Sequence, residues 1–128
     1  MLDASAAVNL LLGTDRASGI AQVPGTVNEA HAPELIDPEV IAVVRLSALC
    51  GWLAVEAGAR AVDELGELAL VRHRHVALRR RAWWLRDRCG GYDGCYIAHA
   101  ETLGAQLLTT HAGPGRAARG LVDVLATR

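Results

Sequence analysis

Three acidic residues and a threonine-histidine pair stand where predicted strands end or predicted helices begin. Asp3 follows the first predicted strand, Glu39 lies in the first turn of a long predicted helix, and Asp93 begins another. Thr109 and His111 close an apolar run that a Gly-Pro-Gly break follows. Because strand-to-helix junctions of a parallel α/β sheet fall on one edge, we expect these side chains to converge. Converging carboxylates repel one another, so the pattern favours a magnesium or manganese site.

Each acid also has a purely structural interpretation. Asp3 and Asp93 are typical helix N-caps, and Glu39 suits the positive end of its helix dipole. Asp37, which precedes Pro38, is the predicted N-cap of the helix that contains Glu39. Capping accounts for each acid singly, but it does not account for several carboxylates at one place.

The rest of the sequence predicts the elements that must position these residues. Strands are expected at 1–5, 28–34, 67–71, 106–110 and 120–127, the last of them at a sheet edge. Helices are expected at 5–13, 15–23, 38–50, 52–65, from 76 onward, and at 92–104. This alternation predicts a three-layer α/β fold, with a mostly parallel sheet of about four to five strands and helices on both faces.

The helix at 38–50 is apolar almost all the way round, which indicates deep burial or a subunit interface. The residues concerned are Val40, Ile41, Val43, Val44, Leu46 and Leu49.

Composition sets the class of protein. The 128 residues, 52% of them hydrophobic, suit a single domain spanning residues 1–128. We expect no membrane span and no leader, because no long uninterrupted apolar stretch occurs. Three cysteines cannot all pair within the chain, so we expect free thiols and a cytoplasmic protein.

Arginine is concentrated in one segment although the net charge is −1. Residues 72–88 hold seven of the 13 basic residues and one acid, Asp87. One interpretation is a solvated helix face whose apolar side chains turn inward, namely Val76, Leu78, Trp83 and Leu85. The other is a phosphate-contacting surface, because the arginine fork suits bidentate contacts with phosphate. Of the adjacent Trp83 and Trp84, we expect one in the core and one facing a partner.

Several histidines and cysteines raise the alternative of a zinc site. Cys95 and His99 have the i, i+4 spacing that places two ligands on one helix face. No CxxC pair accompanies them, however, and small buried thiols are common in cores. The other residues of this set are His73, His75 and Cys89. Tyr92 and Tyr96 are also four apart, and packing is expected of them.

Three stretches resemble, in order and spacing, the PIN-domain ribonuclease toxins of the VapC type, which belong to bacterial toxin–antitoxin pairs. They are "LDASAAVNLLLG", "HAPELIDPEVIAVVRL" and "RAWWLRDRCGGYDGCYIAHAETLGAQLLTTHA", about half of the chain. The resemblance implies a small α/β domain with a central parallel sheet, an acidic site for Mg²⁺ or Mn²⁺, and hydrolysis of RNA phosphodiester bonds. It also implies a cognate antitoxin as partner and a homodimer, the state of many such toxins.

The family's site positions fall on this sequence with one departure. Its first three acids match Asp3, Glu39 and Asp93, and its supporting residues match Ser5 and Thr109. His111 stands where the fourth acid is expected. Glu101 cannot replace that acid, since it lies about 12 Å along the helix from Asp93.

A histidine at the position of the fourth acid removes a negative charge from the site. It also offers nitrogen as a ligand, which manganese and zinc accept more readily than magnesium does. One hypothesis is therefore an active ribonuclease with an altered metal preference. The alternative is a catalytically weak PIN domain that binds an antitoxin or RNA.

Beside this resemblance, the arginine segment acquires a second possible role. It immediately precedes Asp93, so its arginines are expected to flank the site and attract the RNA backbone or an acidic antitoxin tail. They are Arg79, Arg80, Arg81, Arg86 and Arg88.

Overall fold

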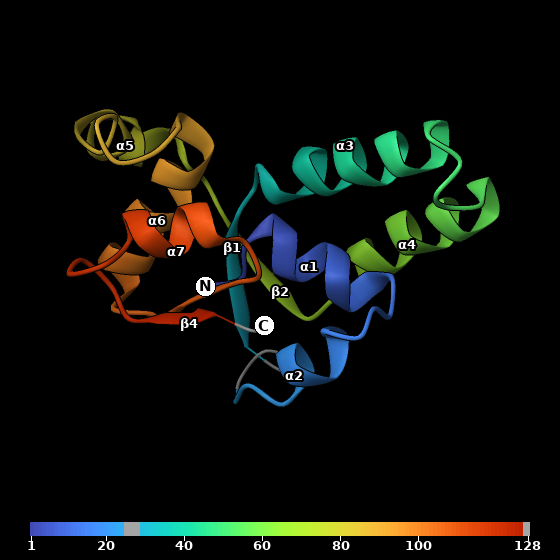
Figure 1. Ribbon diagram of the computed structural model, residues 1–128. Helices are drawn as coiled ribbons and strands as arrows, with labels where there is room; N and C mark the ends of the chain where they lie inside the picture. Colours follow the sequence, from blue (N-terminus) through green and yellow to red (C-terminus); the bar gives the residue numbers. More distant parts are fainter. Residues whose placement is uncertain (25–28, 127–128) are drawn as a thin grey trace.

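The computed structural model describes residues 1–24 and 29–126 (Figure 1). Its helices are α1 (Ala4–Leu11), α2 (Ala17–Ala21), α3 (Ile36–Leu49), α4 (Val55–Glu67), α5 (Arg79–Trp84), α6 (Gly91–Leu103) and α7 (Ala112–Ala117), with the 3₁₀ turn η1 (Val76–Leu78). Its strands are β1 (Ala30–Pro33), β2 (Leu70–His73), β3 (Leu107–Thr109) and β4 (Val124–Ala126). The α/β alternation predicted from the sequence is confirmed.

The strands form two parallel pairs that the amino-terminal residues join. β1 pairs with β2, and β3 pairs with β4. Leu2 lies between the pairs, because its amide donates to the carbonyl of His31 (2.8 Å) and it forms a parallel bridge with Leu108. The resulting order is β2, β1, residues 1–3, β3, β4. The first predicted strand is thus reduced to one bridge, and β4 lies at an edge as predicted.

Helices pack on the sheet from several directions and bury one apolar core. In Figure 1, α1 to α4 lie on one side of β1, and α5 to α7 lie on the other. The largest fully buried apolar side chains come from α2, α3, α6, β3 and the end of α5, and they include Ile20, Ile36, Val40, Leu85, Ile97 and Leu107. Because α1, α3 and α6 all contribute to this core, their amino-terminal ends are held in fixed positions at the sheet edge.

Strand and helix ends differ from the predictions by a few residues, and the predicted break at 113–115 is wrong, because these residues lie inside α7. The strand predicted at 28–34 covers Ala30–Pro33, and the strand predicted at 120–127 covers Val124–Ala126. Residues 28 and 127 lie outside the described residues. The helices predicted at 15–23 and 52–65 cover Ala17–Ala21 and Val55–Glu67.

Two predicted caps are wrong, and one is confirmed. Leu35 is the N-cap of α3, so Asp37 lies inside the first turn, where its carboxylate pairs with Arg72 of β2 (2.7 and 2.8 Å). Gly90 is the N-cap of α6, so Asp93 also lies inside the helix. Asp3 does cap α1, since it accepts a hydrogen bond from the amide of Ala6 (2.8 Å).

The arginine segment is two short helical pieces, η1 and α5, rather than one amphipathic helix. Leu85 is buried as predicted and Leu78 is half-buried, but Val76 and Trp83 are exposed. Trp84 is exposed too, so neither tryptophan reaches the core. The inward-facing side chains predicted from helical spacing are partly wrong, because the segment turns after each short piece and does not present one continuous helix face.

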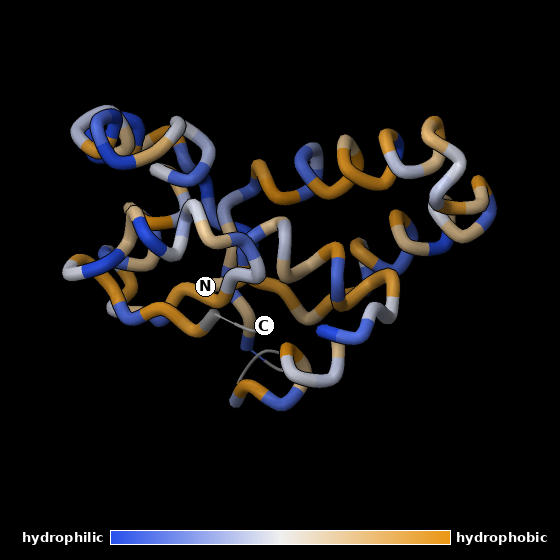
Figure 2. The backbone as a smooth tube through the Cα atoms, viewed as in Figure 1, coloured by the Kyte–Doolittle hydropathy of each residue, from blue (hydrophilic) through white to orange (hydrophobic). Residues whose placement is uncertain are grey.

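Helix α3 is buried on one face only. Val40 and Val44 enter the core, whereas an exposed row continues along the helix, made of Ile41, Val43, Leu46 and Leu49. Figure 2 shows apolar residues along the whole of α3, including its outer side. Deep burial is therefore wrong, and the subunit interface stays a prediction. No helix within the described residues is both long enough and apolar enough to cross a membrane.

Candidate active site

Asp3 lies at the centre of the candidate site, where the bridged amino-terminal strand passes into α1. Its amide donates to the carbonyl of Leu108 (3.1 Å), which holds it beside the end of β3. Its buried carboxylate accepts hydrogen bonds from Ala6 N (2.8 Å) and Ser5 Oγ (2.7 Å). Burial raises the pKa of Asp3, while hydrogen bonds from Thr109, Ala6 and Ser5 and the charge of His111 oppose that rise.

A hydroxyl network supports this carboxylate. Ser5 Oγ accepts from the amide and the hydroxyl of Thr110 (both 3.0 Å) and lies 3.4 Å from Thr109 Oγ1. Asn9, one turn further along α1, donates to Ser5 O (2.8 Å) and Thr110 Oγ1 (3.1 Å). Ser5 and Thr109 were expected at the site from the sequence, and Thr110 belongs to the strand end that was expected there. Asn9 was not predicted, and its signal is its i, i+4 spacing from Ser5.

Tyr96 holds the second acid. Its hydroxyl donates to Glu39 Oε2 at 2.6 Å, and only 2% of its surface is exposed. Burial, then the hydrogen bond to Glu39, raises the pKa of Tyr96 far above its usual range, so the phenol keeps its proton. From the sequence, only packing was expected of Tyr96. Its signal is its position three residues after Asp93, which brings the two side chains close together on the surface of α6.

The charges of the three acids act on one another, although Asp3 precedes α1 and the other two lie on α3 and α6. Burial raises the pKa of half-buried Glu39; the Tyr96 hydrogen bond opposes this, and the charges of Asp93 and Asp3 add to it. The pKa of Asp93 is raised by burial and then by the charge of Asp3, and the charge of His111 opposes that rise. This mutual effect on their pKa values indicates that Asp3, Glu39 and Asp93 share one region of negative potential.

His111 lies at the same edge, at the N-cap of α7. Its amide donates to Thr109 Oγ1 (3.0 Å), and its ring packs so closely that a Cβ at Gly113 would lie 3.1 Å from Cε1. The imidazole is exposed, and its charge lowers the pKa of both Asp3 and Asp93. The structure thus brings His111 near the acids it was expected to join.

The donor set fits a hydrated hard cation better than a closed metal cage. Among residues 1–24 and 29–126, no three His, Cys, Asp or Glu side chains lie close enough to hold a metal ion directly. Carboxylate oxygens are nevertheless the ligands that Mg²⁺ and Mn²⁺ prefer, and Mg²⁺ commonly keeps several waters while one or two carboxylates bind it.

Two of the histidines considered for zinc contact other groups. His73 Nε2 lies 2.8 Å from Nδ1 of His31 on β1, and these two rings stack. His99 packs against His73, and its Nδ1 lies 3.0 Å from the carbonyl of Cys95, which accounts for their i, i+4 spacing.

The five arginines expected to flank the site divide into two groups. Arg81 forms a bidentate pair with Glu101 (both 2.7 Å), and Arg88 donates to backbone carbonyls at the end of α7 (3.3 and 3.2 Å). The other three lie on or beside α5: Arg79 donates to the carbonyl of Val76 (2.8 Å), Arg86 pairs with Asp87 (3.5 Å), and Arg80 is exposed.

Comparison with known proteins gives relatives along most of the chain. It is 38% identical over 112 residues to ribonuclease VapC3 of Mycobacterium tuberculosis, covering 86% of this chain and 80% of the relative. It is 33% identical over 109 residues to ribonuclease VapC9 of the same organism (85% and 83%) and 34% identical over 110 residues to ribonuclease VapC12 (85% and 84%). No protein-family model matches the chain.

Proposed function

The chain belongs to the VapC ribonuclease family, and we propose that it is the toxin of a toxin–antitoxin pair, an endoribonuclease that depends on a divalent metal. The observation that supports this proposal is that Asp3, at the start of α1, Glu39 of α3 and Asp93 of α6 lie near enough for their charges to act on one another. Capping explains the position of Asp3 but does not explain why the other two acids lie near it.

The chain's own residues hold and orient the acidic groups. Ser5 and the first turn of α1 fix the carboxylate of Asp3, and the Tyr96 hydroxyl fixes that of Glu39. These two acids and Asp93 would hold Mg²⁺ or Mn²⁺. When bound, the ion would polarise the scissile phosphate and lower the pKa of the attacking water. Because the pKa of each acid is raised, metal binding should release protons and strengthen as pH rises.

His111 is proposed to shift the metal preference from Mg²⁺ toward Mn²⁺. The test is His111→Asp, with RNA cleavage measured across Mg²⁺ and Mn²⁺ titrations. We expect the added carboxylate to raise Mg²⁺-dependent cleavage, and identical titrations of the two proteins would refute the role given to His111. Asp93→Asn serves as the control, because cleavage that persists in it indicates a contaminating nuclease.

The second candidate function is a binding module that cleaves poorly. It is favoured by His111 at an acid's place and by the lack of a closed metal cluster in the described part of the chain. RNA binding without cleavage in any divalent metal would support it over the enzyme.

The partners proposed for the toxin are an RNA substrate and a cognate antitoxin, with action in the cytoplasm, where that RNA is found. We also propose a homodimer that covers the exposed row of α3. Sedimentation of Leu46→Glu, which places a charge in that row, should then show a smaller species than the wild-type chain.

A further inference from the structure

Two adjacent tryptophans on α5 are exposed to solvent. Trp83 and Trp84 expose 64% and 60% of their surfaces, and Tyr92, at the start of α6, exposes 67%. Large aromatic side chains gathered at a surface commonly mark an interaction site. The carbon of the Arg86 guanidinium lies 5.2 Å from one tryptophan ring centroid and 5.5 Å from the other, so both rings contact one cation.

The packing of α5 holds it against the helix that carries Asp93. A Cβ at Gly94 would lie 3.2 Å from the carbonyl oxygen of Ala82, so the backbone of α5 rests directly on the first turn of α6. Gly94 is the neighbour of Asp93. The bidentate pair of Arg81 with Glu101 holds α5 at a second point. The tryptophans therefore lie on a helix that is packed against the first turn of α6, the turn that contains Asp93.

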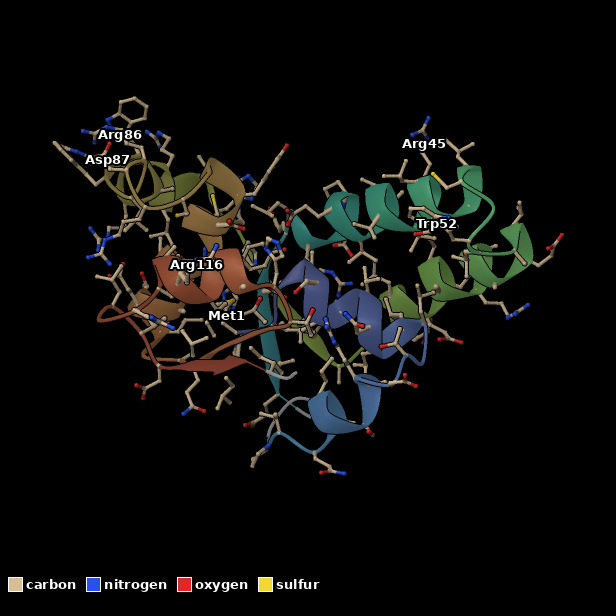
Figure 3. The ribbon with its side chains drawn as sticks, in the orientation of Figure 1. Met1, Arg45, Trp52, Arg86, Asp87 and Arg116 are labelled. Carbon is tan, nitrogen blue, oxygen red and sulfur yellow. The ribbon has the colours of Figure 1, made fainter. Side chains whose placement is uncertain are left out.

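The charge around the rings is positive. Arg79 and Arg80 are exposed, and neither forms an ion pair within the described residues. The exposed row of α3 differs, since it is aliphatic and ends near Trp52. In Figure 3, Arg86 lies at one end of the molecule, and Arg45 and Trp52 lie at the other. Arg86 forms an exposed pair with Asp87 (3.5 Å), so most of the unpaired positive charge comes from Arg79 and Arg80. Flat rings among guanidinium groups complement a polyanion with flat rings of its own.

We propose that Trp83 and Trp84 form a stacking platform for unpaired RNA bases, with Arg79, Arg80 and Arg86 contacting the adjoining phosphates. This inference rests on RNA being the substrate and adds that the substrate is unpaired where it meets α5. Bases within a duplex are already stacked and do not offer their faces, whereas unpaired bases stack readily on aromatic side chains. The platform thus directs single-stranded segments to the acids.

The test measures RNA binding in EDTA, where no cleavage occurs. Fluorescence anisotropy would follow labelled oligouridine and a labelled RNA duplex of equal length with the wild-type chain, Trp83→Ala and Trp84→Ala. Each variant should bind oligouridine about five-fold or more weakly, with duplex binding unchanged. Trp83→Phe and Trp84→Phe should retain most of the affinity, since phenylalanine also stacks.

Trp52→Ala is the matched control, because Trp52 is 81% exposed at the far end of the molecule. Equal oligouridine affinity in the wild-type chain and both α5 variants would overturn the proposal, as would an equal loss on the duplex. A change of oligomeric state with unchanged RNA affinity would also overturn it and assign the tryptophans to a protein interface.

The outcome is separable from that of the proposed function. The binding assay needs neither metal nor turnover, so a chain that does not cleave RNA can still show the platform. Conversely, normal cleavage together with unaltered binding by both α5 variants would refute the platform and leave the ribonuclease assignment intact.

Discussion

The hydrogen bond from Tyr96 to Glu39 can be removed with little change in packing by Tyr96→Phe. Tyr96 is 2% exposed and its ring is part of the core, which phenylalanine fills in the same way. The substitution takes away only the hydroxyl that donates to Glu39 Oε2 at 2.6 Å. It therefore isolates the orientation of one carboxylate from the packing of α6.

The expected cost follows from the partners of this bond. Hydrogen bonds to charged groups contribute roughly 1.5–3 kcal/mol. Glu39 is half-buried, so water can replace part of the lost bond, and we expect a loss of about 1.5 kcal/mol at neutral pH. In a chain of this size that loss corresponds to a fall in Tm of about 5 °C.

The pH dependence identifies the cause. The bond favours the ionised carboxylate, so its removal raises the pKa of Glu39 further above its usual value. The stability difference between the wild-type chain and the variant should be complete above that pKa and should shrink as pH falls through it. Thermal unfolding in EDTA at neutral pH and at about pH 5 measures this difference.

Metal affinity supplies a second measurement. Titration of Mn²⁺, with the free ion followed by electron paramagnetic resonance, should give weaker binding to Tyr96→Phe because Glu39 is no longer oriented. Tyr92→Phe is the control, since Tyr92 is exposed and its hydroxyl makes no hydrogen bond within the described residues. A stability difference that does not change with pH, together with unchanged Mn²⁺ affinity, would show that Tyr96 only packs.

Three further predictions concern stability. Asp3→Asn should abolish cleavage yet stabilise the metal-free chain at neutral pH, because burial raises the pKa of Asp3 and makes its charge costly. Thermal unfolding should show that this gain in stability disappears as pH falls through that pKa. The pKa of His73 is lowered by burial and then by the charges of the neighbouring histidines. The wild-type chain should therefore lose stability below about pH 6.5 relative to His73→Gln. Urea unfolding that shows the same pH dependence of stability in both proteins would contradict this. Gly94→Val should lower the free energy of unfolding by about 1–3 kcal/mol, because the side chain crowds the backbone of α5. Gly66→Ala, with no atom within 4 Å of the new Cβ, should raise it by about 0.5–1 kcal/mol, and calorimetry of both variants measures the difference.

The sequence by itself determined the class of fold and the edge at which the acids lie. Apolar runs ended by glycine and proline mark buried strands, and their alternation with helical periods requires a parallel sheet. Once the sheet is parallel, all strand-to-helix junctions fall at one edge, so Asp3, Asp93 and Thr109 could be assigned to it. This inference needs only local patterns and one rule of topology.

The tertiary structure alone decided which partners each side chain meets. Nothing within α3 or β2 indicates that Asp37 pairs with Arg72 rather than capping its helix, and nothing near Tyr96 indicates that its hydroxyl reaches Glu39. Likewise, a local pattern gives the period of an apolar face but not whether another element covers it. Trp83 and Trp84 are exposed because, among residues 1–24 and 29–126, no element covers the side of α5 that faces away from α6, and this is set by residues distant in the sequence.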